Sequence, residues 1–272
     1  MKNVVVTGSF NNIKSRQVRF LEEAAKIGPL TVLLWSDDAY QHLKGRKPDF
    51  LQNERRYFLE SLRYVEKVIL ADGMVSPDEI PQVEAYKPDV WAVLESDDTF
   101  SKRHFCGSYG IEYFIVKEQD LSGFPILPLE SEPASSHKKV LVTGCYDWFH
   151  SGHVRFFEET SALGDLYVVV GSDENVRLLK GEGHPLLCED ERRYMVQSVR
   201  FVKQALVSTG NGWMDAEPEI GLIKPDIYAV NEDGDKPEKR EFCQEHGLSY
   251  VVLKRVPKEG LKARQSTDLR GF

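Results

Sequence analysis

Short apolar runs alternate with amphipathic stretches through the second half of the chain. The runs are rich in β-branched residues and end in glycine or polar residues, which is typical of buried strands. These expected strands cover residues 139–144, 165–171, 205–208, 227–230 and 248–253. Apolar side chains at helical spacing predict helices at 154–163, 189–202, 218–223 and 237–245. Strands alternating with helices predict a mostly parallel sheet, which binds ligands at the carboxyl ends of its strands.

The first half of the chain repeats this pattern. KNVVVTGSF from Lys2 aligns with KKVLVTGCY from Lys138, and KPDVWAV aligns with KPDIYAV. The offset is 136 residues up to a shared LKG sequence and 137 residues after it. A Pro-, Ser- and Glu-rich stretch separates the two copies and is typical of a linker. We therefore expect an α/β protein with two tandem Rossmann-like domains, at 1–120 and 138–272, joined by a linker at 121–137.

The composition excludes several functional classes. Hydrophobic residues make up 41% and charged residues 29%, as in ordinary globular proteins. The net charge of −8 disfavours binding to nucleic acid or to an anionic membrane, because both are polyanions. No apolar run approaches the roughly 20 residues that span a bilayer, and the N-terminus lacks a signal-peptide pattern. Four cysteines without a CxxC spacing indicate reduced thiols and a cytoplasmic protein.

The loop after the first strand of the second copy carries the candidate chemistry. It reads TGCYDWFHSGH, so that His150 and His153 flank Gly152. This spacing places His153 in or near the first turn of a helix and His150 just before it. A helix N-terminus attracts anions, and two imidazoles there can donate to phosphate oxygens. A zinc site is the alternative, but a structural site needs four ligands, and no Cys or His pair is suitably spaced nearby.

The same loop in the first copy has lost these residues. Lys14, Arg16 and Gln17 stand where the second copy has its two histidines and its glycine, whereas the flanking residues are shared. This contrast separates packing from chemistry within one chain. It predicts that residues 1–120 form a degenerate, non-catalytic copy that serves as a built-in pseudo-dimer partner.

These motifs resemble the HxGH nucleotidyltransferase superfamily, which includes cytidylyltransferases and adenylyltransferases. The resemblance rests on HSGH at 150–153, on LKG followed by the ERR helix at 191–193, and on QSTDL at 265–269. It covers nearly all of residues 138–272 and, in degenerate form, residues 1 to about 116. The tandem layout is most similar to ethanolamine-phosphate cytidylyltransferases. LKG and KPDIYAV also resemble the adenylyltransferase domain of ADP-heptose synthesis.

The resemblance implies transfer of a nucleotidyl group, with CMP from CTP expected, to a small phosphomonoester such as a phosphorylated alcohol or amino alcohol. Pyrophosphate is the leaving group, and Mg²⁺ accompanies the triphosphate without a protein metal site. The implied catalytic residues are His150, His153, Lys180 and Arg192. The implied nucleotide-binding residues are Thr143, Gly144, Cys145, Tyr146, Asp147, Gly152, Arg193, Arg255, Arg264, Ser266 and Thr267.

Several alternatives remain open at the level of sequence. ATP could replace CTP as the nucleotide, or the chain could be a non-catalytic nucleotide-binding regulator. Arg192 and Arg193 recur in the first copy as Arg55 and Arg56, so either could be structural. Asp147 could be a simple turn residue. The family's RTxGxSTT pattern is replaced by RVPKEGLKARQSTDL, so either Arg255 or Arg264 could supply its arginine.

The C-terminal tail is basic, although the protein as a whole is acidic. Residues 254–270 contain six Lys or Arg against two acidic residues, which suits a cover over bound anions. We expect CTP or ATP and a small phosphorylated substrate as ligands. The tandem copies predict a monomer with pseudo-dimeric repeats or a homodimer.

Overall fold

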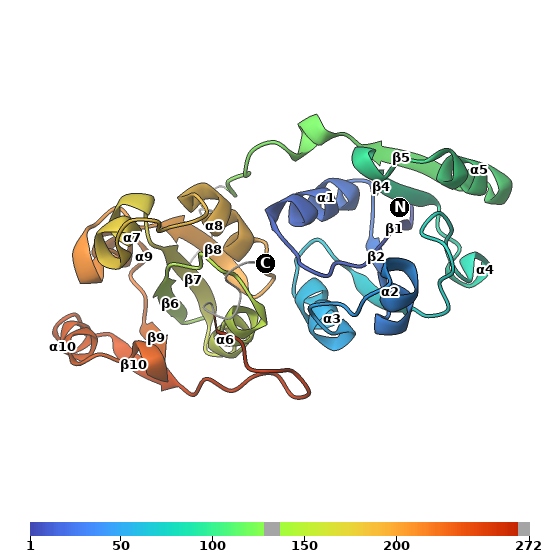
Figure 1. The fold of residues 1–272 in the computed structure, drawn as a ribbon. Coiled ribbons are helices and arrows are strands. Elements are labelled where there is room, and N and C mark those ends of the chain that lie inside the picture. Colours follow the sequence, from blue (N-terminus) through green and yellow to red (C-terminus); the bar gives the residue numbers. More distant parts are fainter. Residues whose placement is uncertain (128–136, 266–272) are drawn as a thin grey trace. The chain divides into compact units, whose positions relative to one another are not determined.

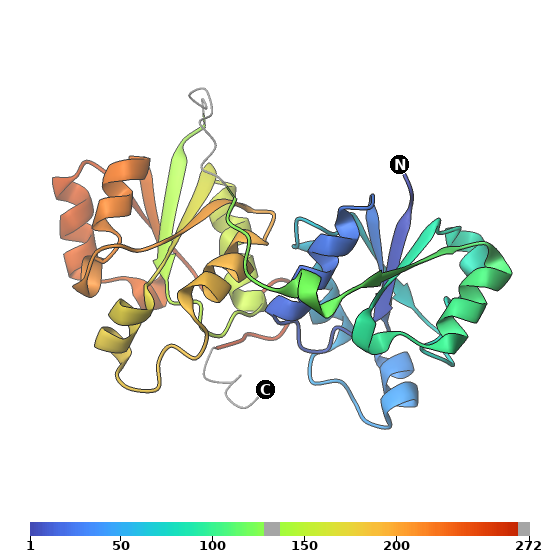
Figure 2. The same ribbon diagram turned by 90° about the horizontal axis from the view of Figure 1, so that it is seen from above.

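Two compact units make up the computed structural model, which describes residues 1–127 and 137–265. The first unit is Met1–Gly123 and the second begins at Phe124. Each unit is a five-stranded parallel sheet with helices on both faces (Figures 1 and 2). This architecture confirms the predicted α/β class with two Rossmann-like domains.

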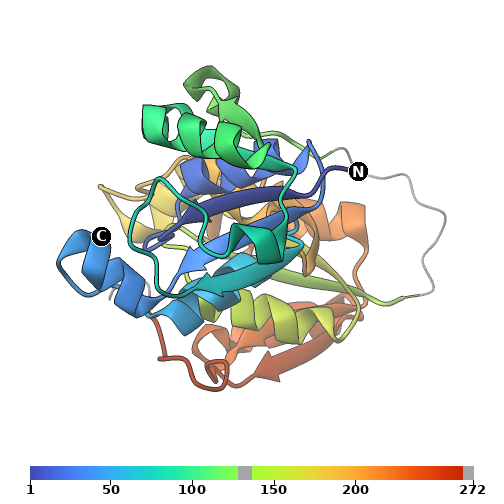
Figure 3. The same cartoon turned by 90° about the vertical axis from the view of Figure 1, so that its right-hand side faces the viewer.

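The first unit alternates strands and helices along its length. Its strands are β1 (Val4–Gly8), β2 (Leu30–Trp35), β3 (Lys67–Ala71), β4 (Val90–Leu94) and β5 (Glu112–Val116). Its helices are α1 (Ser15–Ala25), α2 (Asp37–Lys44), α3 (Gln52–Glu60), α4 (Val83–Tyr86) and α5 (Phe100–Tyr109). Two 3-10 turns, η1 (Glu95–Asp97) and η2 (Glu118–Leu121), follow β4 and β5. Helix α5 packs on the edge strand β5, as the side view in Figure 3 shows.

The second unit repeats this order. Its strands are β6 (Lys139–Gly144), β7 (Asp165–Val170), β8 (Val202–Val207), β9 (Ile227–Asn231) and β10 (Ser249–Leu253). Its helices are α6 (Ser151–Ser161), α7 (Asp173–Lys180), α8 (Glu189–Gln197), α9 (Glu217–Ile223) and α10 (Pro237–Glu245). Its 3-10 turns are η3 (Gly212–Met214) and η4 (Glu232–Gly234).

Both sheets have the same topology. The strand order is β3-β2-β1-β4-β5 in the first unit and β10-β9-β6-β7-β8 in the second. In the second sheet β6 pairs in parallel with β7 on one side and with β9 on the other. The winding therefore reverses between β6 and β9, and the carboxyl ends of these two strands border the crevice where such sheets bind ligands.

Alternate residues of β6 supply the cores on the two faces of its sheet. Val140 and Val142 belong to one apolar cluster, and Leu141 belongs to the cluster on the other face. All three side chains are fully buried. Because helices cover both faces, the strand reads as a continuous apolar run rather than as an alternating one.

The structure differs from the sequence prediction at three helices. Helix α6 begins at Ser151 rather than at Val154, and α8 ends at Gln197 rather than at Val202. Helix α7 was not predicted; its sequence DENVRLLK buries Asn175 and Val176 and leaves Leu178 and Leu179 exposed. Its start is stabilised by Ser172, whose hydroxyl accepts the backbone N–H of Asn175.

The start of the segment predicted as a linker packs against the second unit. The ring of Phe124 lies on Tyr194 with centroids 5.6 Å apart. The backbone carbonyls of Phe124 and Pro125 accept hydrogen bonds from the guanidinium of Arg193 at 3.0 and 3.2 Å. These contacts attach Phe124 and Pro125 to α8, so that the compact second unit includes residues that the sequence assigned to the linker.

Candidate active site

The first turn of α6 holds the two histidines in a fixed arrangement. His150 is the N-cap residue, and its Nδ1 accepts the backbone N–H of Gly152 at 3.0 Å. His153 is the N3 residue, and its Nδ1 accepts the backbone N–H of His150 at 3.3 Å. The two rings stack with centroids 3.9 Å apart. The helix start is therefore closed by the histidines themselves, in the manner of a capping box.

This arrangement decides which ring nitrogen carries the proton. A backbone N–H can only donate, so each Nδ1 that accepts one is unprotonated, and the proton of each neutral imidazole lies on Nε2. Burial lowers the pKa of His153 well below its ordinary value, and the charges of His150, Arg255 and Lys180 act in the same direction. His153 therefore stays neutral as the pH falls through the range in which a free imidazole is protonated. It offers one N–H donor and no charge.

Gly152 is required by the geometry of the cap. A Cβ at this position would lie 2.9 Å from Nδ1 and from Cε1 of His150. Any side chain would therefore displace the ring that caps the helix. The absent side chain also leaves the backbone of the first turn open to a bulky anion.

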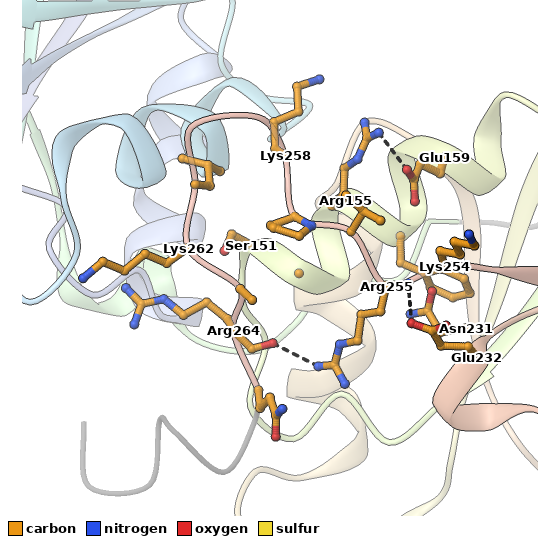
Figure 4. A pocket seen from close by; sticks show the side chains of 17 residues that line it. Ser151, Arg155, Glu159, Asn231, Glu232, Lys254, Arg255, Lys258, Lys262 and Arg264 are labelled. Carbon is orange, nitrogen blue, oxygen red and sulfur yellow. Dashed lines mark hydrogen bonds and ion pairs between the residues drawn. The ribbon is translucent and has the colours of Figure 1, made fainter.

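A basic pocket lies beside this helix start, with a volume of about 230 Å³. It is formed by one side of α6, the carboxyl end of β9 and the segment 254–265 (Figure 4). Its charged lining comprises Arg155, Lys254, Arg255, Lys258, Lys262 and Arg264 against Glu159 and Glu232. The excess of cations in an acidic protein suits an anionic ligand.

Arg255 and Arg264 are both found in the pocket lining and are linked to each other. The guanidinium of Arg255 donates to the backbone carbonyl of Arg264 at 3.0 Å and to Asp233 at 2.6 Å. Lys258 in the same segment pairs with Glu158 of α6 at 2.6 Å. These bonds hold segment 254–265 over the first turns of α6. Ser266 and Thr267, predicted to bind nucleotide, lie outside the described residues.

Lys180 approaches the same site from the other side of β6. It is the last residue of α7, its side chain is exposed, and its charge contributes to the lowered pKa of His153. The charge of Lys180 thus acts on His153, whereas the predicted role of Lys180 at a bound phosphate stays a prediction.

The side chain of Arg192 is bonded to residues other than the two histidines. Its side chain is fully buried and donates to the carbonyls of Leu187 at 2.9 Å and Cys145 at 2.7 Å, and to Asp173 at 2.7 Å. Arg55 makes the matching set of bonds in the first unit. In both copies the guanidinium ties the residue after the first strand to the start of the next helix but one and to the loop that follows that helix. This indicates a structural role, and the catalytic contact of Arg192 stays a prediction.

Arg193 is also directed elsewhere. It is 4% exposed, and its guanidinium bonds the carbonyls of residues 124 and 125. These bonds attach the segment that enters the second unit, and the contact of Arg193 with nucleotide stays a prediction. The sequence signal for this outcome was present, because the arginine pair recurs in the copy without histidines.

Asp147 orients a loop. Its buried carboxylate accepts the backbone N–H groups of Leu186 at 2.8 Å and Leu187 at 3.0 Å. In the first unit Asn11 stands at the same position and accepts the two matching backbone groups through its amide oxygen. The residue therefore positions the loop between α7 and α8, rather than serving as a simple turn residue.

Residues at the end of β6 support the loop that carries His150 and His153. The hydroxyl of Thr143 bonds that of Tyr228 at 2.9 Å, and Cys145 supplies the carbonyl that Arg192 binds. Tyr146 has a φ of 55°, and its ring covers Gly144 so closely that a Cβ there would lie 2.8 Å from the ring. Phe10 and Gly8 repeat this arrangement in the first unit. These residues shape the loop that presents the histidines.

Replacing Tyr146 by Phe is expected to stabilise the ligand-free protein. The Tyr146 hydroxyl is buried without a hydrogen-bond partner among the described residues, and burial raises its pKa far above the ordinary value. Removing an unsatisfied buried hydroxyl gains about 1 kcal/mol, or about 3 °C in melting temperature. Thermal unfolding of Tyr146→Phe measures this change. A lower melting temperature would show that the hydroxyl has a partner in solution.

Comparison with known proteins identifies the fold. The profile of the cytidylyltransferase-like family matches residues 141–262. The FAD synthase of Ferroglobus placidus is 36% identical over 135 residues, which are 48% of this chain and 85% of that enzyme. The chain belongs to the cytidylyltransferase-like family. It is a nucleotidyltransferase, and the match lies on the unit that contains His150 and His153.

Two further comparisons each match part of the chain. The bifunctional protein HldE of Desulfatibacillum aliphaticivorans is 36% identical over 128 residues, but the chain spans only 26% of its length. A lipopolysaccharide core biosynthesis protein from Thermoplasma volcanium is 23% identical, with a TM-score of 0.39, over 46% of this chain and 100% of its own length.

The first unit keeps one bond of the helix cap with a different residue. Gln17 accepts the backbone N–H of Lys14 at 3.1 Å, as His153 does for His150. A glutamine therefore satisfies the helix start as well as an imidazole does. The bond that His153 makes to the helix start therefore does not need histidine, which agrees with the function predicted for this residue.

An ion pair fills the corresponding position in the first unit. Arg16 stands where α6 has Gly152, and its guanidinium bonds Glu118, which stands where the second unit has Arg255. Where the second unit has an open turn and a cation, the first has a side chain and a carboxylate paired to each other. Both differences disfavour binding of a phosphate group at this helix start of the first unit.

Among residues 1–127 and 137–265, no three or more His, Cys, Asp or Glu side chains are grouped so as to hold a metal ion. In the same part of the chain, no helix has the length and apolar character needed to cross a membrane.

The sequence missed the walls of the pocket. Arg155 and Glu159 of α6 line the pocket together with Lys258, which lies about 100 residues further along the chain, so that these side chains meet only in the fold. The excess of Lys and Arg in residues 254–270 was the signal that pointed to them.

Proposed function

We propose that the second unit transfers a nucleotidyl group from a nucleoside triphosphate to a small phosphomonoester. An oxygen of the acceptor phosphate attacks the α-phosphorus, a new phosphorus–oxygen bond forms, and the bond from the α-phosphorus to the bridging oxygen breaks as pyrophosphate leaves. The observation that carries this proposal is the pair of imidazoles held at the α6 N-terminus, each with its Nδ1 bonded to a backbone N–H, beside a basic pocket.

Positioning and charge stabilisation account for the rate in such a reaction, because little covalent chemistry is asked of the protein. His150 and His153 donate to oxygens of the α- and β-phosphates as charge develops there. The pocket beside α6 holds the rest of the nucleotide, with Arg255 and Arg264 in its wall. Lys180 neutralises phosphate from the β7 side of the site.

Mg²⁺ would accompany the triphosphate and neutralise its phosphate oxygens. Asp147, the carboxylate next to the histidine loop, is buried and already accepts two backbone N–H groups. The residues present therefore fit an ion bound through phosphate oxygens and water, rather than one held in a protein cage.

ATP is favoured as the nucleotide over the CTP expected from the sequence. The relatives aligned with this domain include FAD synthases, and FAD contains an adenylyl group joined to a flavin phosphate. This supports adenylyl transfer to a phosphorylated acceptor.

Release of pyrophosphate tests the proposal. The protein is incubated with ATP or CTP, Mg²⁺ and a panel containing riboflavin 5′-phosphate, a sugar 1-phosphate, glycerol 3-phosphate and ethanolamine phosphate. Pyrophosphate that requires both a nucleotide and one acceptor, and that ceases in His150→Ala, supports transfer. Bound nucleotide without release across the panel would favour a non-catalytic regulator instead.

Location and assembly are proposed from the sequence. The four free cysteines, two of them buried, agree with a cytoplasmic protein. A monomer with pseudo-dimeric repeats and a homodimer remain the two assemblies that we propose, and light scattering distinguishes them.

A further inference from the structure

A histidine outside the HxGH motif faces a buried carboxylate next to the phosphate-binding loop. Nδ1 of His184 lies 3.5 Å from Oδ2 of Asp147, and the two side chains are 25% and 4% exposed. Asp147 precedes His150 by three residues, and His184 lies in the loop between α7 and α8. The contact thus joins this loop to the loop that presents the motif histidines.

The first unit shows that the charge of Asp147 is not needed to hold the loop. Asn11 stands at the position of Asp147 and holds the equivalent loop with its amide oxygen at 2.8 and 3.2 Å. Lys47 stands at the position of His184. A neutral acceptor is therefore sufficient for the backbone bonds. The negative charge is present only in the copy that also places an imidazole opposite it.

The loop that carries His184 reaches the site from the side opposite the basic pocket. The pocket is lined by residues from α6, the end of β9 and segment 254–265, and by none from residues 178–187. Because β6 lies between β9 and β7, the loop that comes after β7 and α7 borders the other side of the histidines. Lys180, at the start of this loop, is close enough for its charge to act on His153.

We propose that His184 binds the phosphate group of the acceptor and that Asp147 is the positioning residue for its imidazole. As an imidazolium, His184 donates from Nδ1 to Asp147 and from Nε2 to a phosphate oxygen. The present 3.5 Å contact is long for a hydrogen bond, and such contacts shorten when a site fills. The nucleotide and the acceptor then approach from opposite sides of α6, as an in-line displacement requires. This inference rests on the proposed function.

Steady-state kinetics with the best acceptor of the panel test the role of His184. His184→Ala is expected to raise the KM for the acceptor at least about tenfold, because a charge-assisted hydrogen bond is lost. The Kd for the nucleoside triphosphate, measured by calorimetry, is expected to change less than about twofold. An unchanged acceptor KM, or an equal loss of nucleotide affinity, would overturn the assignment.

Asp147→Asn isolates the charge. Asn11 indicates that the loop bonds survive this change, so the melting temperature should stay within about 2 °C while the acceptor KM rises. If Asp147 acts through the imidazole, the double variant is no worse than His184→Ala alone. Additive effects would contradict a shared role. Lys47→Ala in the first unit is the matched control and should leave both constants unchanged.

A binding measurement separates this inference from the proposed function. Inorganic phosphate is titrated into the wild-type protein and into His184→Ala, both saturated with an α,β-methylene nucleotide analogue. Binding weakened at least about fivefold in the variant supports the site even if no acceptor in the panel releases pyrophosphate. Equal binding to both proteins, or no binding to the wild type, would overturn the inference even if transfer is observed.

Discussion

His150→Ala is expected to lower the rate of pyrophosphate release at least about 100-fold. The loss follows from removing one donor aimed at the charge that develops on the transferred phosphate, which typically costs about 3–4 kcal/mol in transition-state stabilisation. His150 also caps α6, since its Nδ1 accepts the N–H of Gly152. Alanine therefore removes a cap worth about 1 kcal/mol as well as the donor.

His150→Asn separates these two roles. Asparagine is a good N-cap residue and restores the bond to the helix start, but it places no donor where Nε2 lies. We expect a normal melting temperature and a rate as low as that of the alanine variant. A rate close to that of the wild type in either variant would remove the assigned role of this imidazole. Lys14→Ala, at the same position of the first unit, should leave the rate unchanged.

Arg192→Met is expected to destabilise the second unit by about 3 kcal/mol, or about 10 °C in melting temperature. Methionine keeps the apolar stem, but the buried carbonyls of Leu187 and Cys145 lose their hydrogen bonds and Asp173 loses its ion pair. Unsatisfied buried groups of this kind account for the largest single-residue losses of stability. Thermal or urea unfolding measures the change.

The first unit supplies the matched control for this prediction. Arg55→Met breaks the equivalent bonds and should destabilise that unit to a similar degree, with no effect on pyrophosphate release. A stable Arg192→Met protein that binds nucleotide poorly would instead support the contact with phosphate predicted from the sequence. Arg192→Lys should resemble methionine, because an ammonium cannot span three acceptors in different directions.

The duplication made much of this protein predictable from one sequence. Alternating patterns predicted two parallel sheets, and the loss of both histidines from one copy predicts that the chemistry lies at α6. Gln17 and Asn11 each make the structural bonds of their counterparts His153 and Asp147. This supports the prediction that what differs at these two positions bears on function.

The sequence by itself determined the fold class, the tandem repeat and the HSGH turn, because these depend on local periodicity and on spacing within one helix start. Only the tertiary structure showed the bonding partners of Arg192 and Arg193 and the side chains of α6 that line the pocket. The sequence alone does not show whether the Arg192 guanidinium faces a ligand or two carbonyls and a carboxylate, because these partners come from other parts of the chain. The contact of His184 with Asp147 was hidden for the same reason: 37 residues separate them along the chain, and only the folded loops bring their charges together.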